Sequence, residues 1–133
     1  MRADITGEDD EGMSLFTPAE ARETLAELRP DLDAFVTMRA DAAELAAAVR
    51  VGEPSALGGR PELKALEARL DELMTRIQET GVTVKGFAPL LLDFPSDLDG
   101  EDVLLCWLEG DRELAWYHRT DLGFLGRRRL PPE

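Results

Sequence analysis

The sequence contains very little cysteine, histidine or asparagine. Its 133 residues include one cysteine, one histidine and no asparagine. A single cysteine excludes an internal disulfide, and the lack of asparagine excludes N-glycosylation. The class of small secreted proteins that are held together by disulfide bonds is therefore excluded.

Long apolar segments are also missing. The uninterrupted apolar runs span only a few residues, whereas a membrane-spanning helix needs about 20. The N-terminal residues are mostly acidic and form no apolar core, so we do not expect a signal peptide. We therefore expect a cytoplasmic protein with no membrane partner.

Positive charge is the third scarcity. The chain has 15 lysine and arginine residues against 28 aspartate and glutamate residues, which gives a formal net charge of −13. Non-specific binding of nucleic acid depends on basic residues that neutralise phosphates, so nucleic acid is not an expected partner. Residues 119–133 reverse the sign, because four arginines stand against two acidic residues there. The sequence therefore still allows a small anion to bind near this end.

Two amphipathic helices are expected in the first part of the chain. Thr17 and Pro18 are residue types typical of an N-cap and a first helical position, and Glu20 has the position of a capping-box partner. Pro30 interrupts the helical pattern, so we expect either a kink there or two helices end to end. Apolar residues nevertheless continue along one face at steps of three and four: Leu25, Leu28, Leu32, Phe35, Met38, Ala42, Leu45 and Val49.

The second helix is expected to begin at Pro61 and to end before Gly81. Its apolar residues have the alternating steps of three and four that are typical of a seam between helices: Leu63, Leu66, Leu70, Leu73 and Ile77. A connection rich in glycine and proline separates the two segments. The sequence therefore predicts an antiparallel helical hairpin.

After residue 81 the apolar pattern changes to the period of two that is typical of strands. Strands are expected at residues 82–84, 90–94, 103–108 and 113–118. A two-residue turn at Gly110 and Asp111 then pairs Val103 with His118. This register places Cys106 on the face opposite to His118, and it leaves both faces of the sheet mostly apolar.

These elements predict one α+β domain at residues 14–133, after a disordered acidic tail at residues 1–13. The helical hairpin occupies residues 14–81, with its first helix kinked at Pro30. An antiparallel β-sheet occupies residues 82–118, and a segment rich in glycine and arginine occupies residues 119–133. We expect the hairpin to pack on the sheet.

Three stretches of the chain are similar to a known family. Residues 15–21 read LFTPAEA, residues 91–95 read LLDFP, and the third stretch runs from LCW at 105–107 through WYH at 116–118 to GFLGR at 123–127. In this order they resemble an uncharacterised bacterial family, domain of unknown function 2203, over roughly residues 14–130. The resemblance implies a compact bacterial cytoplasmic protein and supplies no activity.

His118 is the main candidate for chemistry, because it is the only imidazole in the chain. It is a candidate general base or metal ligand, with Asp121 orienting it or binding the same ion. Asp93, Glu109 or Cys106 are candidates to complete such a site. The expected register separates His118 from Glu109 and disfavours a pair with Cys106, so we assign no metal ligands. The alternative is a structural histidine that bonds the backbone at a strand end.

Two further features have alternative interpretations. Asp93 is a carboxylate within an apolar run, and it is either catalytic or a structural group that caps a turn or pairs with an arginine such as Arg127. Gly123, Gly126 and Arg127 form a candidate anion site, in which backbone N–H groups and a guanidinium hold phosphate or carboxylate. Alternatively, these arginines pair with the acidic surface or with a neighbouring subunit.

The function favoured by the sequence is a non-catalytic interaction or assembly module that forms a homodimer. The helical seam, the two apolar faces of the sheet and the opposite charges along the chain support it. The alternative is a protein that binds a small ligand, an anion or a metal, or an enzyme, with a site around His118, Asp93, Asp121 and Arg127. No cofactor is identified.

Overall fold

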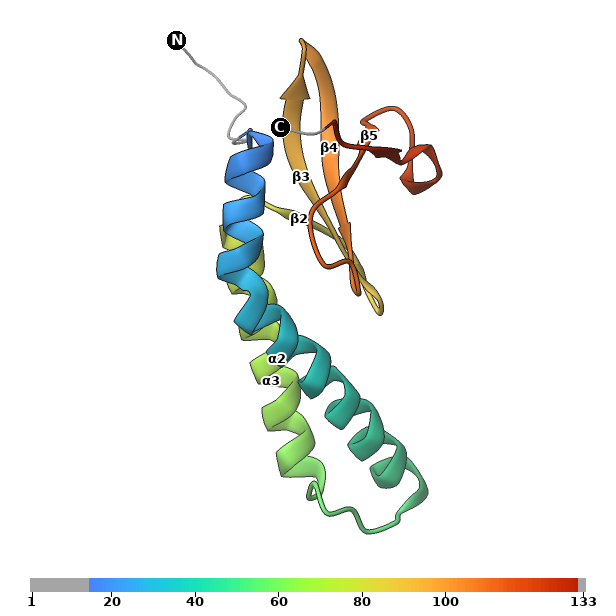
Figure 1. Cartoon of the computed structure of the whole chain (residues 1–133). Helices are drawn as coiled ribbons and strands as arrows, with labels where there is room; N and C mark the ends of the chain where they lie inside the picture. The colour runs from blue at the N-terminus through green and yellow to red at the C-terminus, as the bar shows by residue number, and fades with distance from the viewer. Residues whose placement is uncertain (1–14, 132–133) are drawn as a thin grey trace, which may run out of the picture. The chain divides into compact units, whose positions relative to one another are not determined.

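The computed structural model describes residues 15–131, and the predicted disordered tail lies outside them. Two helices, α2 (Pro18–Val51) and α3 (Arg60–Glu79), come first (Figure 1). They are followed by β2 (Thr83–Phe87), β3 (Leu90–Leu98), β4 (Glu101–Leu108), β5 (Trp116–Arg119), the short 3-10 helix η1 (Phe124–Gly126) and β6 (Arg128–Arg129). This α+β architecture confirms the predicted fold class. The chain divides into two compact units, Glu27–Glu79 and the remainder.

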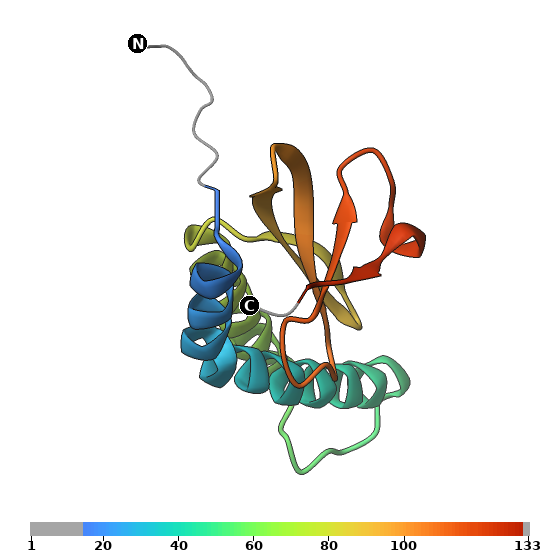
Figure 2. The ribbon, with the colours of Figure 1, turned by 45° about the horizontal axis from the view of Figure 1, so that its top comes forward.

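The unit Glu27–Glu79 is the helical hairpin, in which α2 and α3 lie side by side (Figure 2). Helix α2 runs through Pro30 without interruption, so the alternative of two helices end to end is wrong. The predicted apolar stripes are buried in part: Leu32, Phe35, Leu73 and Ile77 are among the buried residues of the hairpin. An ion pair between Arg76 and Asp31 (3.1 Å) joins the two helices at their surface.

The other unit begins with the first turns of α2. The backbone N–H of Thr17 donates to Glu20 Oε1 (2.9 Å), and the N–H of Glu20 donates to Thr17 Oγ1 (3.0 Å). These reciprocal bonds confirm the predicted capping box. The Phe16 ring meets the Phe94 ring edge to face, with 5.3 Å between centroids. The start of α2 is thereby attached to the sheet.

The sheet is antiparallel throughout, in the order β2-β3-β4-β5-β6. Strand β3 continues to Leu98, beyond Pro95, where we expected it to end. Pro95 is tolerated because its carbonyl accepts the N–H of Phe16 (2.7 Å) and not one from β4. Since the N and O of one strand residue point to the same side, the missing proline N–H removes no bond to β4.

The register between β4 and β5 differs by one residue from the prediction. Leu104 pairs with His118 and Cys106 pairs with Trp116. The predicted pairing of Val103 with His118 is therefore wrong. Because neighbouring residues of a strand point to opposite faces, this shift moves His118 to the face that carries Cys106. The prediction that these two side chains lie on opposite faces is wrong as well.

The connection between β4 and β5 explains the shift. It spans residues 109–115 and is not a two-residue turn. The N–H of Leu108 donates to Asp111 Oδ2 (3.0 Å), and Trp107 Nε1 donates to the carbonyl of Asp111 (2.9 Å). The carbonyl of Leu114 accepts from Arg22 Nε (3.2 Å). Residues 109–115 thus bond to other segments, and β5 begins only at Trp116.

Candidate functional site

Three neighbouring strands bring Asp93, Cys106 and His118 together. Asp93 on β3 pairs with Cys106 on β4, and His118 on β5 pairs with Leu104, two residues before Cys106. Alternate residues of a strand share a face, so all three side chains lie on the same side of the sheet. One carboxylate oxygen, the thiol sulfur and one ring nitrogen lie within 4.8 Å of one another.

All three residues are buried, with exposed fractions of 2% for Asp93, 0% for Cys106 and 5% for His118. Burial raises the pKa of the Cys106 thiol from 9.0 to about 12. The negative charge of Asp93 acts in the same direction, and the positive charge of Arg127 opposes it. The thiol is therefore protonated at neutral pH, which makes it a poor nucleophile without an activating group.

One hydrogen bond determines the tautomer of His118. Its Nδ1 lies 2.9 Å from the backbone carbonyl oxygen of Arg119. A carbonyl oxygen only accepts, so Nδ1 donates the proton, and in the neutral ring Nε2 has a free lone pair. A structural histidine is the alternative interpretation, and its expected hydrogen bond to the backbone is present at Nδ1. Nε2 faces a side chain and not the backbone. Nε2 lies 3.5 Å from Asp93 Oδ1.

Asp93 has a different environment at each oxygen. Its Oδ2 lies 3.6 Å from Lys85 Nζ, in an ion pair with a half-exposed lysine. Its Oδ1 is buried and has no hydrogen-bond partner within residues 15–131. A buried carboxylate oxygen without a donor is unfavourable and rare. The cationic partner of Asp93 is thus Lys85, and not Arg127 as the sequence suggests.

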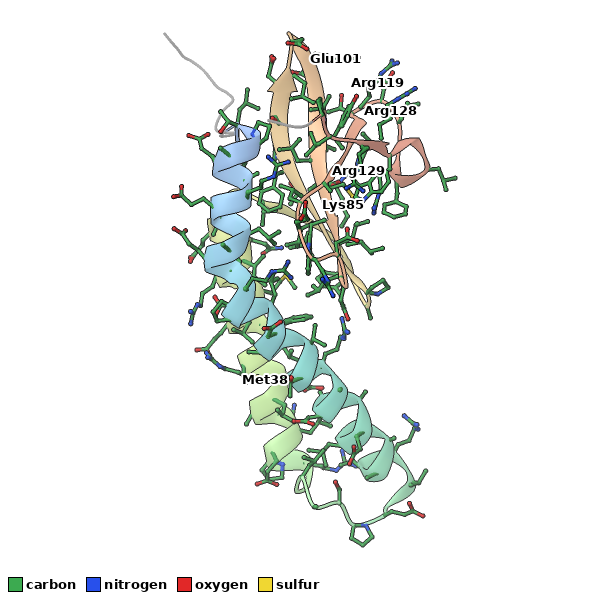
Figure 3. The ribbon with its side chains drawn as sticks, viewed as in Figure 1. Met38, Lys85, Glu101, Arg119, Arg128 and Arg129 are labelled. Carbon is green, nitrogen blue, oxygen red and sulfur yellow. The ribbon has the colours of Figure 1, made fainter. Side chains whose placement is uncertain are left out.

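A pocket of about 340 Å³ opens over this group of side chains. Asp93, His118 and Lys85 are among its lining residues. Figure 3 labels the Lys85 side chain among those of the sheet. We refer to this pocket as the sheet pocket, and its other lining residues are Leu91, Leu104, Thr120, Asp121, Leu122, Gly123 and Phe124. This volume lies at the small end of the range for small-molecule sites.

Comparison with protein families identifies the family of this chain. A family model described as "Uncharacterized conserved protein (DUF2203)" matches residues 14–130. The chain belongs to the DUF2203 family. No curated protein and no solved structure matches it.

The structure brings some of the remaining candidate residues of this DUF2203 protein to the same place. Asp121 and Gly123 line the sheet pocket with His118. Asp121, however, bonds to Arg119, with 2.6 Å between Oδ2 and Nη2. It therefore does not orient the His118 ring, whose Nδ1 bonds the backbone. Glu109 lies elsewhere, where its Oε1 accepts the N–H of Leu90 (2.8 Å).

The guanidinium of Arg127 stacks on two aromatic rings. Its guanidinium carbon lies 4.6 Å from the centre of the Trp116 ring and 4.7 Å from that of Phe124. Nη2 is 3.8 Å from Asp111 Oδ2, and Nη1 is buried with no hydrogen-bond partner in the described chain. Gly126 leaves no room for a side chain, because a Cβ there would lie 2.9 Å from that of Leu122. Stacking on these two rings thus orients Arg127, and the anion site at Gly123, Gly126 and Arg127 stays a prediction.

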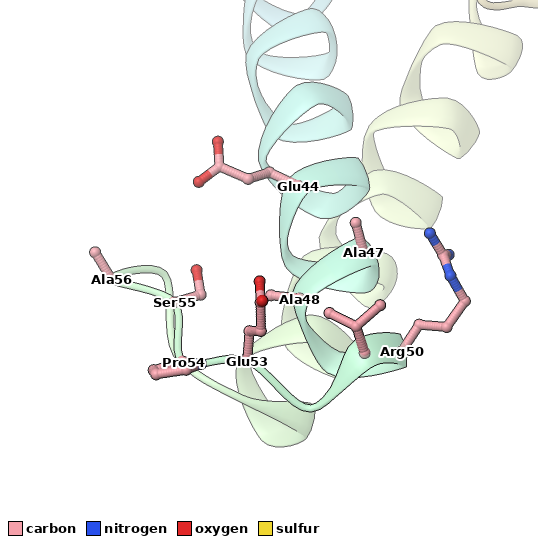
Figure 4. Close-up of a pocket in the computed structure, with 9 residues that line it drawn as sticks. Glu44, Ala47, Ala48, Arg50, Glu53, Pro54, Ser55 and Ala56 are labelled. Atoms are coloured by element: carbon pink, nitrogen blue, oxygen red, sulfur yellow. The ribbon is translucent and has the colours of Figure 1, made fainter.

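Another hollow lies in the helical hairpin, at the end of α2. Glu44, Arg50 and Glu53 line it together with alanines and the start of the connection to α3 (Figure 4). Its lining includes no histidine or cysteine, so it offers none of the softer metal ligands found at the sheet pocket.

Within residues 15–131 no helix is long and apolar enough to cross a membrane.

Lys85 is the site residue that sequence reasoning missed. It lies at an irregularity of β2, because Val84 pairs with Leu92 and Gly86 pairs with Leu91. A bulge redirects side chains in a way that a simple alternation of faces does not predict. The only signal in the sequence is that Lys85 is one of two lysines and precedes a glycine within the short strand.

Proposed function

We propose that this chain binds a divalent transition-metal ion of the zinc class through Asp93, Cys106 and His118. The observation that carries the proposal is the 3.5 Å separation between Asp93 Oδ1 and His118 Nε2. With a neutral imidazole both atoms present lone pairs; both residues are buried, and no donor of the described chain is hydrogen-bonded to Oδ1. A cation between them turns a repulsive contact into an attractive one.

The distance supports a shared ion. Zinc binds histidine nitrogen and carboxylate oxygen at about 2.0–2.2 Å with tetrahedral angles, so two such ligands lie about 3.4 Å apart. The other ring nitrogen, Nδ1, donates its N–H to the carbonyl of Arg119, which is the usual arrangement around a histidine ligand. Asp93 and His118 therefore need little movement to reach a shared ion.

The donor set supports the choice of metal. Thiolate, imidazole and carboxylate together favour zinc and similar ions over magnesium and calcium, which prefer oxygen ligands alone. Three protein ligands beside an accessible pocket are typical of sites that leave one coordination position open. Binding displaces the proton of Cys106, whose thiol is protonated in the metal-free protein.

Cobalt titration of the metal-free protein tests the proposal. We expect one Co²⁺ per chain, with an absorption band from the bond between the Cys106 thiolate and cobalt. Cys106→Ser removes that band, and His118→Gln weakens binding by more than about 100-fold, since even the loss of an outer-shell partner costs 10- to 100-fold. Asp121→Asn is the matched control, because Asp121 lines the same pocket but lies outside the group of three.

Two results would contradict the proposal. One is the absence of stoichiometric cobalt or zinc binding in a protein whose circular dichroism shows the folded state. The other is equal binding by the wild type and the Cys106→Ser and His118→Gln variants, which would place the ion elsewhere.

We also propose, as a second candidate, the interaction module that forms a homodimer. The observation in its favour is an exposed apolar loop, in which Leu125 is fully exposed and Leu122 and Phe124 are 42% and 39% exposed. Exposed apolar groups of this kind often mark interfaces. Light scattering should then give a dimer mass for the wild type and a smaller mass for Leu125→Ser. A monomeric wild type would overturn this candidate.

A further inference from the structure

The sheet pocket has an asymmetric environment around the proposed metal. Asp93 and His118 line the pocket, whereas Cys106 is fully buried and lies outside its lining. An ion held by all three would therefore have the sulfur on its protein side. Its remaining coordination position would point into the pocket, where a ligand can reach it.

The charges around that position favour an anion. The two positive charges of the ion are matched by the Asp93 carboxylate and the Cys106 thiolate. Asp121, which also lines the pocket, pairs with Arg119 at 2.6 Å, and the longer contact of Arg119 with Glu101 (3.4 Å) lies outside the pocket lining. Lys85 then contributes one positive charge in excess, and its Nζ lies 3.6 Å from the Asp93 carboxylate at the edge of the pocket. A monoanion that displaces metal-bound water neutralises this excess.

Four of the remaining lining residues have apolar side chains, beside Thr120, Asp121 and Gly123. Leu91 and Leu104 are partly exposed on the sheet, and Leu122 and Phe124 are 42% and 39% exposed on the loop that follows β5. Exposed leucine and phenylalanine side chains beside a cation favour a ligand with a hydrocarbon part. Inorganic phosphate has no such part and carries more negative charge than the pocket balances.

We propose that the metal-loaded sheet pocket binds a small organic monocarboxylate. One carboxylate oxygen takes the open coordination position, Lys85 pairs with the carboxylate, and Leu104, Leu122 and Phe124 contact the hydrocarbon part. This inference rests on the proposed metal site, and it adds the chemical class of the ligand.

Calorimetry and the cobalt spectrum of the metal-loaded protein test the inference with defined probes: butanoate, acetate, butan-1-ol and inorganic phosphate. We expect butanoate to shift the cobalt bands and to bind about tenfold more tightly than acetate, because its two additional methylene groups are buried. Butan-1-ol, which lacks the charge, and phosphate should bind more weakly than butanoate. The metal-free protein should bind none of the four.

Variants separate the contribution of the Lys85 charge to butanoate binding from that of the Phe124 ring. Lys85→Met should weaken butanoate binding by about tenfold, which corresponds to a charged hydrogen bond, while one metal ion per chain is retained. Lys64→Met is the matched control, since Lys64 is the only other lysine and is exposed on α3. Phe124→Ala should weaken butanoate binding more than acetate binding, because acetate is too short to need the ring.

The failures of the two proposals are distinguishable. If no metal binds to the folded protein, both are overturned. If one metal binds but butanoate changes neither the heat nor the spectrum, only the carboxylate inference is overturned. Tighter binding of phosphate than of butanoate would also overturn it. Loss of the metal itself in Lys85→Met would overturn the role of Lys85 as an anion partner and make it a positioning residue for Asp93.

Discussion

Cys106 on β4 and His118 on β5 lie on one face of the sheet, because the register pairs Cys106 with Trp116 and Leu104 with His118. Asp93 on β3 pairs with Cys106 from the other side of β4. Two backbone ladders, which join three strands, therefore bring three different donor atoms to one buried point. Folding creates this arrangement, and the unfolded chain lacks it.

Zinc should therefore stabilise the fold. A ligand that binds only the folded state, at a concentration 100 times its Kd, increases the free energy of unfolding by about 2.7 kcal/mol. Urea denaturation with zinc and with a chelator measures the difference. His118→Gln should show no such gain, and an equal gain in this variant would contradict a site that contains His118.

Asp93→Asn should stabilise the metal-free protein while it weakens metal binding. An asparagine amide at this position donates a hydrogen bond to His118 Nε2, where the carboxylate now presents an unpartnered oxygen. We expect a gain of about 1 kcal/mol in the free energy of unfolding, the net value of one added hydrogen bond. Urea denaturation in chelator measures it against Asp121→Asn. A loss of stability in Asp93→Asn would show that its ion pair with Lys85 outweighs the repulsion.

The sequence predicted the helices and most strands because their signals are local. Thr17 and Glu20 form their capping box within four residues, and an apolar stripe needs only the helical period. Pro95 misled the prediction of the end of β3. The effect of Pro95 depends on Phe16, which is distant in sequence. The backbone N–H of Phe16 donates to the Pro95 carbonyl on the side of β3 that faces away from β4.

The candidate site was predicted in part for the same reason. Asp93 and His118 stood out as polar residues in apolar strands. The expected register separates Cys106 from His118, because a one-residue error in register moves a side chain to the opposite face. That register depends on where the β4–β5 connection ends. The connection is held in part by the bond from Arg22 to the carbonyl of Leu114, and these two residues are distant in sequence.

The metal-free protein should lose stability at alkaline pH through Cys106. Its folded pKa of about 12 is higher than the ordinary 9.0, so the folded chain keeps a proton that the unfolded chain releases. The stabilisation is complete below pH 9 and is lost as the pH rises toward 12. Denaturation in chelator across this range should show a steeper decline in the wild type than in Cys106→Ala. Parallel declines would contradict the raised pKa.

Iodoacetamide should modify the buried Cys106 thiol only after the chain unfolds.

Thr17→Ala should destabilise the fold without changing metal binding. It removes the side-chain acceptor of the Glu20 N–H and half of the capping box, for a loss of about 1 kcal/mol. Thr17→Ser keeps the hydroxyl and is the matched control, with stability close to that of the wild type. Thermal denaturation measures both variants, and cobalt titration at a temperature where both are folded should give unchanged affinity. A weakened cobalt affinity in Thr17→Ala would mean that the start of α2 helps to order the three strands that hold Asp93, Cys106 and His118.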